Sequence, residues 1–522
     1  MNRPTRDRYD VVVLGGAFSG AATALLLRRD HPDISVLVVE KSKQFDLKVG
    51  EATTEMAAMF LTRRLALWRH LEKDQLPKEG LRFWFHDEKV RHHWQATEAG
   101  GFVRSAVPSF QLRRDLLDQK ILDDAVAAGA ELLRPARVRD VEIGKFDHRV
   151  LIDSGSETIA VGCRWIIDAS GRATVLGRKL GLIERNEAHP TAASWARFRN
   201  VRHIDDLAAE GPVEFAQRNL SSRRLATNHY PGKGYWIWVI PHGNDETSIG
   251  LVWDRTMVDL HERRDREAAF REFLASRAPL AELLERAELR SEDFRHYSTL
   301  AYATKQYMGE GWALVGDAAV FLDPFYSPGL DHCAFSVEAT VAIVGEEAAG
   351  KPVEERVREH NETFVRSYWH FFEAVYKGKY AYMGEADLLS ASFLLDTAQY
   401  YIFVVIPAYR FYGRFFWMPV LGPKGAFFNF RLMKFYNRRF QRLAALRERL
   451  GVAGKHNAGR RIRAYYALDS APFRMALRGV RLWWAAELDT AWLRFRRLFT
   501  PAPAPAVEKG RADGTAPLSS GG

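Results

Sequence analysis

Cysteine is scarce in this chain, and long apolar runs are missing. Only two cysteines, Cys163 and Cys333, occur among 522 residues, which is too few for a disulfide framework and is typical of a reducing cytoplasm. No run of roughly 18 or more apolar residues is present, so we expect no membrane-spanning helix. The apolar run at residues 11–16 is short and leads straight into a glycine turn, unlike a secretory signal peptide. We therefore expect a cytoplasmic protein.

Acidic residues are fewer than basic ones: the chain has 65 Asp and Glu but 75 Lys and Arg, which gives a net charge of +10. Much of the excess lies after residue 430, in runs at 438–449 and 460–463. These runs predict a basic C-terminal face that would attract acidic proteins or anionic lipids, although a solvated helix face is the default interpretation. Because no nucleic-acid-binding motif accompanies them, we expect no nucleic-acid partner.

A strand–turn–helix–strand pattern opens the chain, with strands predicted at 9–14 and 34–39 and a helix at 21–29. The turn is a dinucleotide-binding fingerprint in which alanine replaces the middle glycine. We expect its backbone amides to bind a pyrophosphate at the helix N-terminus, and the carboxylate of Glu40, just after the second strand, to accept ribose hydroxyls. The fingerprint residues are Gly15, Gly16, Ala17 and Gly20.

Three later motifs favour FAD over NAD. Arg114 opens a predicted helix in a pattern similar to the Arg-x-x-x-Asp of aromatic hydroxylases, where the arginine approaches the phosphate or ribityl side of the cofactor. Asp168 and Gly171 follow a strand and resemble the D-A-x-G motif near the pyrophosphate. Gly316 and Asp317 resemble the motif whose aspartate bonds the ribityl hydroxyls. In this order the motifs resemble the para-hydroxybenzoate-hydroxylase-like FAD fold, over residues 8 to about 345.

The fold class that follows is α/β. We predict a discontinuous Rossmann-like FAD-binding domain at residues 1–350, with a mostly antiparallel substrate-side sheet interleaved at about 78–110 and 190–300. A helical, aromatic-rich region is expected at 351–500, and a disordered tail at 501–522, which is rich in Pro, Gly and Ser. The strand-like runs lie at 80–85, 191–198, 235–240 and 247–253, and a polar helical stretch lies at 259–288.

Aromatic side chains crowd the C-terminal region, above all at residues 356–379 and 400–436, with arginines and lysines between them. The favoured interpretation is a helical subdomain that packs these rings on the FAD-binding domain. The alternative is a surface for a membrane interface or a large apolar partner, because Lys and Arg can snorkel beside aromatics.

One strand carries two indoles. Side chains alternate along a strand, so Trp236, Trp238 and Ile240 share a face. An isolated W-x-W would favour a plain core strand. The full pattern W-x-W-x-I-P, in a chain with flavin motifs, resembles the signature of flavin-dependent halogenases. In that family this wall keeps the substrate away from the flavin, so that oxygen goes to halide.

Lys78 stands just before a predicted strand, between the loop Gly50-Glu51-Ala52-Thr53 and the arginine helix. The loop resembles the family's G-E-A/S-T loop, which lies against the isoalloxazine ring, although Thr54 and Glu55 follow where the family usually has an aliphatic residue and proline. The position of Lys78 resembles that of the halogenase lysine, which holds hypochlorous acid by a hydrogen bond or takes up chlorine as a chloramine. Burial would lower its pKa and make it more nucleophilic. Most lysines are simply solvated surface residues.

The segment 323–330 follows the Gly-Asp motif and precedes a helix, where backbone amides can bind an anion. In the family, successive amides here bind the halide. Pro328 has no N–H, so halide binding would rest on Gly329 and Leu330, with Ser327 supplying a hydroxyl.

Tyr326 in that segment stands where some tryptophan halogenases have a glutamate, so the chain looks closer to the phenol- and pyrrole-acting members. The base that removes the ring proton is not identified. Asp331 and His332 are candidates, although either could simply cap the helix.

The resemblance implies halogenation of an electron-rich aromatic, phenol- or pyrrole-like, free or tethered to a carrier protein. Reduced FAD and O2 would give a flavin hydroperoxide, chloride or bromide would be oxidised to hypohalous acid, and Lys78 would receive it. A separate flavin reductase is expected, because no second dinucleotide fingerprint is found. No metal is expected, and peripheral membrane contact stays open. The alternatives are a flavin monooxygenase or a prenyl or polyene reductase on the same fold, and a non-catalytic flavoprotein of a biosynthetic complex.

Overall fold

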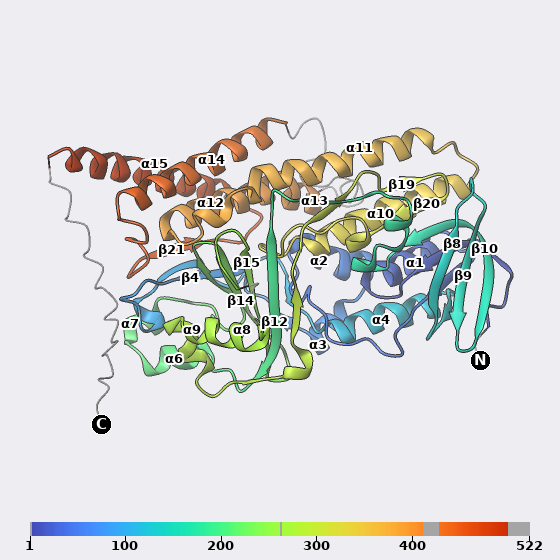
Figure 1. Ribbon diagram of the computed structural model, residues 1–522, viewed down its shortest axis with the longest axis horizontal. Helices are drawn as coiled ribbons and strands as arrows, with labels where there is room; N and C mark the ends of the chain where they lie inside the picture. The colour runs from blue at the N-terminus through green and yellow to red at the C-terminus, as the bar shows by residue number, and fades with distance from the viewer. Residues whose placement is uncertain (1–2, 261–263, 411–426, 500–522) are drawn as a thin grey trace, which may run out of the picture.

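Two large sheets and a layer of helices build the molecule. The computed structural model describes residues 3–260, 264–410 and 427–499. Figure 1 shows the first sheet beside the N-terminus, the second sheet further along the long axis, and the C-terminal helices along one edge of both. The α/β fold that the sequence predicts is confirmed, while the boundary at residue 350 stays a prediction.

The first sheet is mainly parallel, in the order β19-β20-β10-β1-β2-β7, with β8 and β9 attached as an antiparallel extension. Its central strand β1 is buried from Val11 to Leu14, an uninterrupted apolar run of the kind that interior parallel strands have. Helix α1 begins at Phe18, three residues earlier than predicted, so the fingerprint turn is shorter. The strands are β1 (Arg8–Leu14), β2 (Val36–Val39), β7 (Glu131–Leu133), β8 (Arg137–Glu142), β9 (His148–Ser154), β10 (Glu157–Asp168), β19 (Met308–Gly309) and β20 (Trp312–Leu314).

Helices surround the first sheet and lead from it to the second. The principal ones are α1 (Phe18–Asp30), α2 (Glu55–Met59), α3 (Trp68–Asp74), α4 (Arg114–Ala127), α5 (Val175–Lys179) and α10 (Gly329–Ala348). Helix α10 packs against α1, and Gly316 of the Gly-Asp turn lies between Ser19 of α1 and Cys333 of α10.

The second sheet is mostly antiparallel, in the order β16-β12-β15-β14-β13-β4-β5-β21, with β17 beside β12. All four strand-like runs of the sequence are strands here. The last strand, β21, comes from the C-terminal region and pairs with β5, which the sequence did not predict. The strands are β4 (Leu81–Phe85), β5 (Thr97–Gly101), β12 (Thr191–Arg199), β13 (Thr227–Gly232), β14 (Tyr235–Pro241), β15 (Glu246–Asp254), β16 (Glu288–Leu289), β17 (Arg295–Tyr297) and β21 (Arg461–Ala464).

Short elements complete the connections between these layers. Within the described part of the predicted helical stretch at 259–288, two helices form, separated by a two-residue break. These and the remaining short elements are α6 (Ile204–Glu210), α7 (Val213–Gln217), α8 (Arg266–Ala275), α9 (Ala278–Leu284), and the two-stranded pairs β3 (Leu76–Pro77) with β6 (Phe110–Gln111) and β11 (Ile183–Arg185) with β18 (Tyr302–Thr304).

Strand β14 divides two hydrophobic cores, as its alternating side chains predict. Trp236, Trp238 and Ile240 belong to the large core shared with the first sheet. The alternate residues, Tyr235, Ile237 and Val239, belong to a smaller core on the far face of the second sheet. The two indoles therefore face the FAD-binding side.

The C-terminal region is mainly helical, as predicted, and many of its rings are buried. Phe364, Tyr376 and Phe393 are at most 2% exposed, whereas Phe403 and Phe428 are exposed. The predicted tail at 501–522 and the aromatic residues at 411–417 lie outside the described residues. The helices are α11 (Glu354–Phe371), α12 (Ala386–Tyr400), α13 (Ile406–Arg410), α14 (Phe427–Arg449) and α15 (Ala471–Arg497).

One helical stretch, Ala386–Arg410, is long and apolar enough to cross a membrane, which differs from the sequence expectation. However, 61% of its most apolar window is buried inside the protein, as in the core helix of a globular protein. Both cysteines are free and buried, and burial raises the pKa of each thiol to about 12, so neither is a reactive thiolate at neutral pH.

Gly250 of β15 lies directly under the Trp238 ring, and we predict that Gly250→Ala destabilises the protein by roughly 1–3 kcal/mol through overpacking. An added Cβ would lie 2.0 Å from Cζ2 of the indole. Gly162→Ala in β10 is the matched control, because its Cβ would make ordinary contact with Arg8. Urea unfolding measures both, and equal stability of the two variants would show that the indole is free to move.

Candidate active site

The turn between β1 and α1 leaves no room for a side chain at Gly15 or Gly20. Gly15 has a φ of +103°, and a Cβ there would lie 2.6 Å from the carbonyl oxygen of Ala169. A Cβ on Gly20 would lie 1.8 Å from the carbonyl oxygen of Gly15. Ala17 is the N-cap of α1 in extended conformation, so its methyl group is accommodated. The turn therefore presents backbone amides at the start of a helix, the arrangement that binds a pyrophosphate.

Glu40 closes this turn from the end of β2. Its carboxylate accepts hydrogen bonds from the amides of Gly16 and Ser42, both at 2.8 Å. The side chain is 5% exposed, at the carboxyl end of a parallel strand where a ribose binds in folds of this kind. The placement fits the predicted contact with a dinucleotide.

The predicted FAD motifs meet at the same edge of the first sheet, because β1, β10 and β20 are parallel neighbours. Arg114 forms a two-pronged ion pair with Asp118 and donates a hydrogen bond to the carbonyl of Val49 at 3.1 Å. Burial raises the pKa of Asp317, against the opposing effect of Arg172 and Arg114. A ligand that offers hydroxyl donors would stabilise this carboxylate.

Asp168 is hydrogen-bonded within its own turn, and its predicted role near the pyrophosphate stays a prediction. Its carboxylate accepts hydrogen bonds from the amides of Ser170 and Leu176, at 2.9 and 2.7 Å. It thereby fixes the turn that contains Gly171, whose φ is +62°. Any contact of this motif with FAD would come from the turn's backbone. The glycine turn, Glu40 and Asp317 together fit FAD.

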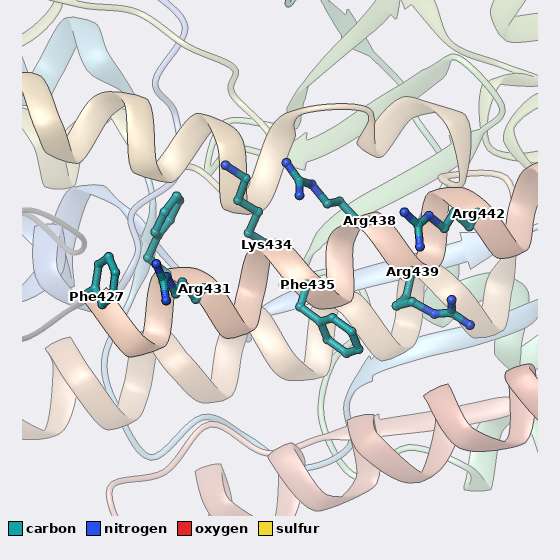
Figure 2. Close-up of a pocket in the computed structure, with 8 residues that line it drawn as sticks. Phe427, Arg431, Lys434, Phe435, Arg438, Arg439 and Arg442 are labelled. Carbon is teal, nitrogen blue, oxygen red and sulfur yellow. The ribbon is translucent and has the colours of Figure 1, made fainter.

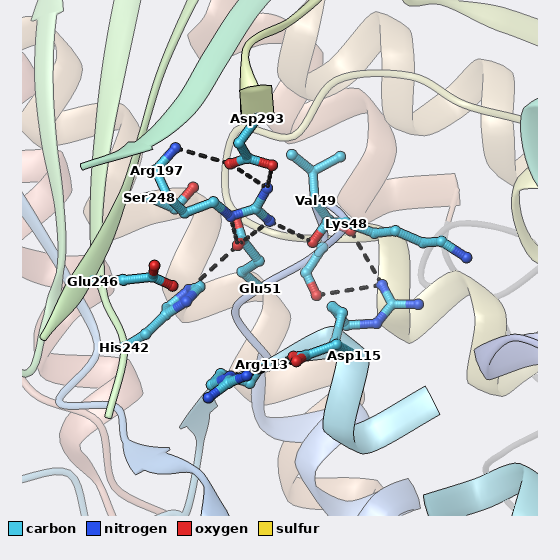
Figure 3. Close-up of polar contacts among 12 residues, drawn as sticks. Lys48, Val49, Glu51, Arg113, Asp115, Arg197, His242, Glu246, Ser248 and Asp293 are labelled. Carbon is cyan, nitrogen blue, oxygen red and sulfur yellow. Dashed lines mark hydrogen bonds and ion pairs between the residues drawn. The ribbon is translucent and has the colours of Figure 1, made fainter. Parts of the chain in front are cut away.

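Arg197 joins β12 of the second sheet to the predicted flavin loop, and the sequence did not single it out. Figure 3 shows it reaching from β12 between Asp293 and Glu51. Its Nε donates to Glu51 at 3.0 Å, its Nη1 to Asp293 at 3.0 Å, and its Nη2 to the carbonyl of Lys48 at 3.1 Å. The side chain is fully buried. Glu51 is thus an anchor of the loop, and the loop's backbone and Gly50 and Ala52 remain the predicted contacts to the flavin.

The two indoles of β14 form a tilted pair, with ring centroids 5.7 Å apart and planes at 46°. Trp238 donates its Nε1 hydrogen to the hydroxyl of Ser248 at 3.1 Å. Trp236 lies against the ring of Phe325, 5.1 Å between centroids. Because both rings are buried and hydrogen-bonded, they form a fixed wall on the FAD-binding side of the second sheet.

A chain of buried hydrogen bonds locks Trp236 in place. Its Nε1 donates to the hydroxyl of Tyr380 at 2.9 Å, and that hydroxyl donates to Asp323 at 2.8 Å. The Nε2 atom of His189 lies 2.7 Å from the same carboxylate oxygen. The chain connects the wall to the first residue of the 323–330 segment, through a tyrosine of the C-terminal region.

Lys78 is 5% exposed and lies against the flavin loop. Its Nζ donates to the carbonyl of Thr53 at 2.6 Å. Burial lowers the pKa of Lys78 to about 8, although the carboxylates of Glu55 and Asp331 act in the opposite direction. This amine is therefore partly neutral near pH 8, unlike a surface lysine.

His229 connects the lysine to the wall. Its ring lies 5.5 Å from that of Trp236 and stacks on Phe83. Burial, together with the charge of Lys78, lowers the pKa of His229 to about 3. A neutral imidazole and the Phe83 ring thus lie beside Trp236, near enough to Lys78 for its charge to act on the imidazole, so the region has a low dielectric constant.

The predicted halide segment makes an unusual turn before α10. Tyr326 and Ser327 both have positive φ, +72° and +59°, a strained conformation for non-glycine residues that recurs at functional sites. Helix α10 begins at Gly329, with Pro328 as its N-cap. As the first helical residues, Gly329 and Leu330 have no acceptor for their amides within the helix, which fits the predicted anion site.

The two candidate bases lie in different surroundings. Asp331 accepts hydrogen bonds from the Thr54 hydroxyl, the Ala57 amide and the Tyr400 hydroxyl, and burial raises the pKa of Asp331 to about 6. His332 points into a separate aromatic cluster, beside the Tyr307 ring. Of the two, Asp331 belongs to the surroundings of Lys78, where it also fixes the start of α2.

Tyr326 faces the C-terminal helices. Its hydroxyl donates to Asp396 of α12 at 3.2 Å and accepts from Lys379 at 3.3 Å, while its ring lies against that of Phe325, with the planes tilted by 36°. The buried ion pair of Lys379 with Asp396 holds this phenol, which the sequence could not show.

The comparison with known proteins agrees with this site. A glycine turn, a buried acid after β2 and a Gly-Asp turn after β20, on a parallel sheet beside an antiparallel one, define an FAD-dependent enzyme fold. The family model of the FAD binding domain matches residues 8–334, more than half of the chain, so the chain belongs to the FAD binding domain family.

Among known proteins, the chain is similar to flavin-dependent halogenases and to a reductase. The flavin-dependent halogenase chlA of Dictyostelium discoideum is 26% identical over 442 residues, 77% of this chain and 71% of that protein. A 1H-pyrrole-2-carbonyl-[peptidyl-carrier protein] chlorinase of Pseudomonas fluorescens is 24% identical over 70% of this chain and 83% of its own length. The menaquinone reductase of Mycolicibacterium smegmatis is 28% identical over 62% of this chain and 73% of its own length.

Solved structures agree on the fold. The crystal structure of halogenase PltM in complex with phloroglucinol and FAD matches with a TM-score of 0.71 and 18% identity, over 92% of this chain and 96% of that one. The predicted FAD fold and the resemblance to flavin-dependent halogenases are confirmed. The roles of individual residues stay predictions.

Arg197→Gln should destabilise the protein by roughly 3–5 kcal/mol, because it leaves the buried carboxylates of Glu51 and Asp293 without their partner. Arg199→Gln is the matched control, since Arg199 lies on the same strand with an exposed side chain. Denaturant unfolding and FAD titration of both variants measure the effect. A stable Arg197→Gln protein with unchanged FAD affinity would refute the anchoring role.

Tyr380→Phe should loosen Trp236, because it removes the only group that the structure shows accepting from its Nε1 within the described residues. We expect a loss of roughly 1–3 kcal/mol in stability and a larger share of oxygen released as hydrogen peroxide. Tyr382→Phe, which removes a buried hydroxyl bonded to Asn437, is the control. Peroxide yields that are equal in the two variants would contradict the locking of Trp236.

Proposed function

We propose that this protein is a flavin-dependent halogenase that acts on an electron-rich aromatic. The observation that carries the proposal is the combination of a fixed indole pair, Trp236 and Trp238, with a buried lysine whose pKa is lowered to about 8. Reduced FAD, when bound, would supply the electrons that activate O2, and the activated oxygen would oxidise the halide to hypohalous acid. The chain's own residues exclude water, hold the halide and pass the halogen on.

Lys78 is suited to receive the halogen as a neutral amine. Its nitrogen attacks the chlorine of hypochlorous acid, the N–Cl bond forms as the Cl–O bond breaks, and the amine proton and hydroxide leave as water. A ring carbon of the substrate then takes the chlorine, the electron pair of the N–Cl bond returns to nitrogen, and the amine regains a proton. In its protonated form Lys78 would instead hold hypochlorous acid by a hydrogen bond. The ring proton goes to a base, for which Asp331 is better placed than His332.

The remaining predicted residues have proposed roles in the same reaction. The amides of Gly329 and Leu330, with the hydroxyl of Ser327, bind chloride or bromide. The indole wall keeps the aromatic substrate away from the flavin, and so prevents its direct hydroxylation. The rings of Phe83 and Phe325, which contact each other beside Trp236 of the wall, suit a phenol- or pyrrole-like substrate, free or tethered to a carrier protein.

Reduced FAD would come from a separate reductase, and we propose a cytoplasmic location, which two free buried cysteines support. The alternative is reduction of a prenyl or polyene chain, which the similarity to menaquinone reductase favours. That reaction would need neither halide nor the amine of Lys78.

Purified protein, a flavin reductase and a panel of free and carrier-tethered phenols and pyrroles test the function, with mass spectrometry of the products. We expect products that depend on chloride or bromide. Lys78→Met should remove at least ~99% of halogenated product while flavin oxidation continues, and the exposed Lys73→Met should leave the yield unchanged. Turnover without halide, or an active Lys78→Met variant, would rule out the proposed mechanism.

The pH dependence of stability tests the state of Lys78. Its pKa is lower in the folded protein than in the unfolded chain, so between pH 8 and about 10.4 the unfolded chain binds more protons. Folding stability should therefore rise with pH across this window, relative to Lys78→Met, by on the order of 3 kcal/mol. Urea unfolding at several pH values measures the difference. Parallel curves for the two proteins would mean that the amine has an ordinary pKa.

A further inference from the structure

Helix α15 has its apolar face turned to solvent. Six large side chains are each 51–66% exposed along this helix: Phe473, Leu477, Trp484, Leu488, Trp492 and Phe495. Spacings of three, four and seven residues place them on one stripe, because an α-helix has 3.6 residues per turn. From the first to the last, the stripe extends about 33 Å at 1.5 Å per residue.

The opposite face of α15 is already packed against the protein. Met475, Gly479, Ala486 and Thr490 are buried there, and Gly479 lies so close to α12 that a Cβ would be 2.8 Å from Cγ of Leu395. The outward stripe is therefore not needed to hold α15 in place, and an exposed apolar strip of this length indicates an interaction surface.

Positive charges predominate beside the stripe, with Asp469 at its start paired to Arg474. Arginines border it along the whole helix, while the two acidic residues of α15 are engaged elsewhere. Glu487 pairs with Arg439 and accepts from Trp483, and Asp489 pairs with Lys455. The bordering arginines are Arg474, Arg478, Arg481 and Arg494.

Helix α14 continues this surface. Figure 2 shows Lys434, Arg438 and Arg442 rising from one side of the helix, while Phe435 and Arg439 lie on another. Phe435 contacts Trp483 of α15, with 6.0 Å between ring centroids, so the two helices form one continuous surface. We call the exposed apolar and cationic side chains of α14 and α15 the basic–aromatic face.

We propose that the basic–aromatic face docks the protein on an anionic phospholipid membrane, peripherally and without spanning it. Trp, Phe and Leu would enter the boundary between headgroups and acyl chains, and the arginines would contact lipid phosphates. A second copy of this chain would bring like charges together along the same stripe. An acidic protein would satisfy the arginines but would leave most of the apolar strip uncovered. The inference is independent of the proposed enzymatic function.

Cosedimentation of the full-length protein with vesicles tests the proposal. We expect binding to vesicles of phosphatidylcholine and phosphatidylglycerol, weak binding to phosphatidylcholine alone, and loss of binding at high salt. The double variant Trp484→Ser, Trp492→Ser should bind at least about ten-fold more weakly, because each indole contributes buried apolar area. Trp68→Ser, an exposed tryptophan of α3, is the control and should bind as the wild type does.

Other occupants would give different results. If the wild type does not bind anionic vesicles, or the double variant binds them equally well, the proposal is wrong. A dimer in sedimentation equilibrium that the double variant abolishes, without vesicle binding by the wild type, would assign the face to a second copy. Saturable binding of an acidic carrier protein in place of vesicles would assign it to that partner. Circular dichroism of each variant establishes that α15 is intact.

Discussion

The hydrogen bond from Trp236 to Tyr380 ties together the three parts of the molecule on which the proposed chemistry depends. The indole belongs to the second sheet, the phenol to the C-terminal region, and Asp323, which the phenol contacts next, to the segment that leads into α10. A buried N–H without an acceptor would cost stability, so the ring has one favoured orientation. Because the same bond chain fixes the wall and the predicted halide segment, the two cannot shift independently.

Burial sets the electrostatics around this wall. Lys78, Glu55 and Asp331 interact in a buried region. Burial lowers the pKa of Lys78 and raises the pKa of Glu55 and of Asp331, and each shift favours the neutral form of the group. Arg197, in contrast, remains charged in the interior, because it forms ion pairs with the carboxylates of Glu51 and Asp293. The ion pair with Glu51 anchors the loop at 50–53, which is predicted to lie against the flavin ring. The carbonyl of Thr53, to which Lys78 donates, belongs to the same loop.

Local patterns account for what the sequence predicted well. The βαβ unit, the strand with Trp236 and Trp238, and the Gly-Asp turn are each formed by residues that are close in sequence. Residue propensity and periodicity are therefore enough to predict them. Contacts between distant residues could not be read in this way. Arg197 and Glu51 are 146 residues apart, Trp236 and Tyr380 are 144 apart, and Arg461 of β21 pairs with Glu98 of β5 from a distant part of the chain. The apolar residues of the exposed stripe on α15 recur with a helical period. This period predicts a helix, but it does not predict that the stripe faces solvent and the opposite face packs on α12.

The proposed mechanism requires that hypohalous acid formed at the flavin passes the indole wall and reaches Lys78. Peptide mass spectrometry after turnover with reduced FAD, O2 and chloride, in the absence of an aromatic substrate, tests this most directly. The account predicts chlorine in place of one hydrogen on Lys78, removable by a mild reductant and absent without chloride. Chlorine spread over exposed lysines, with Lys78 unmodified, would contradict it.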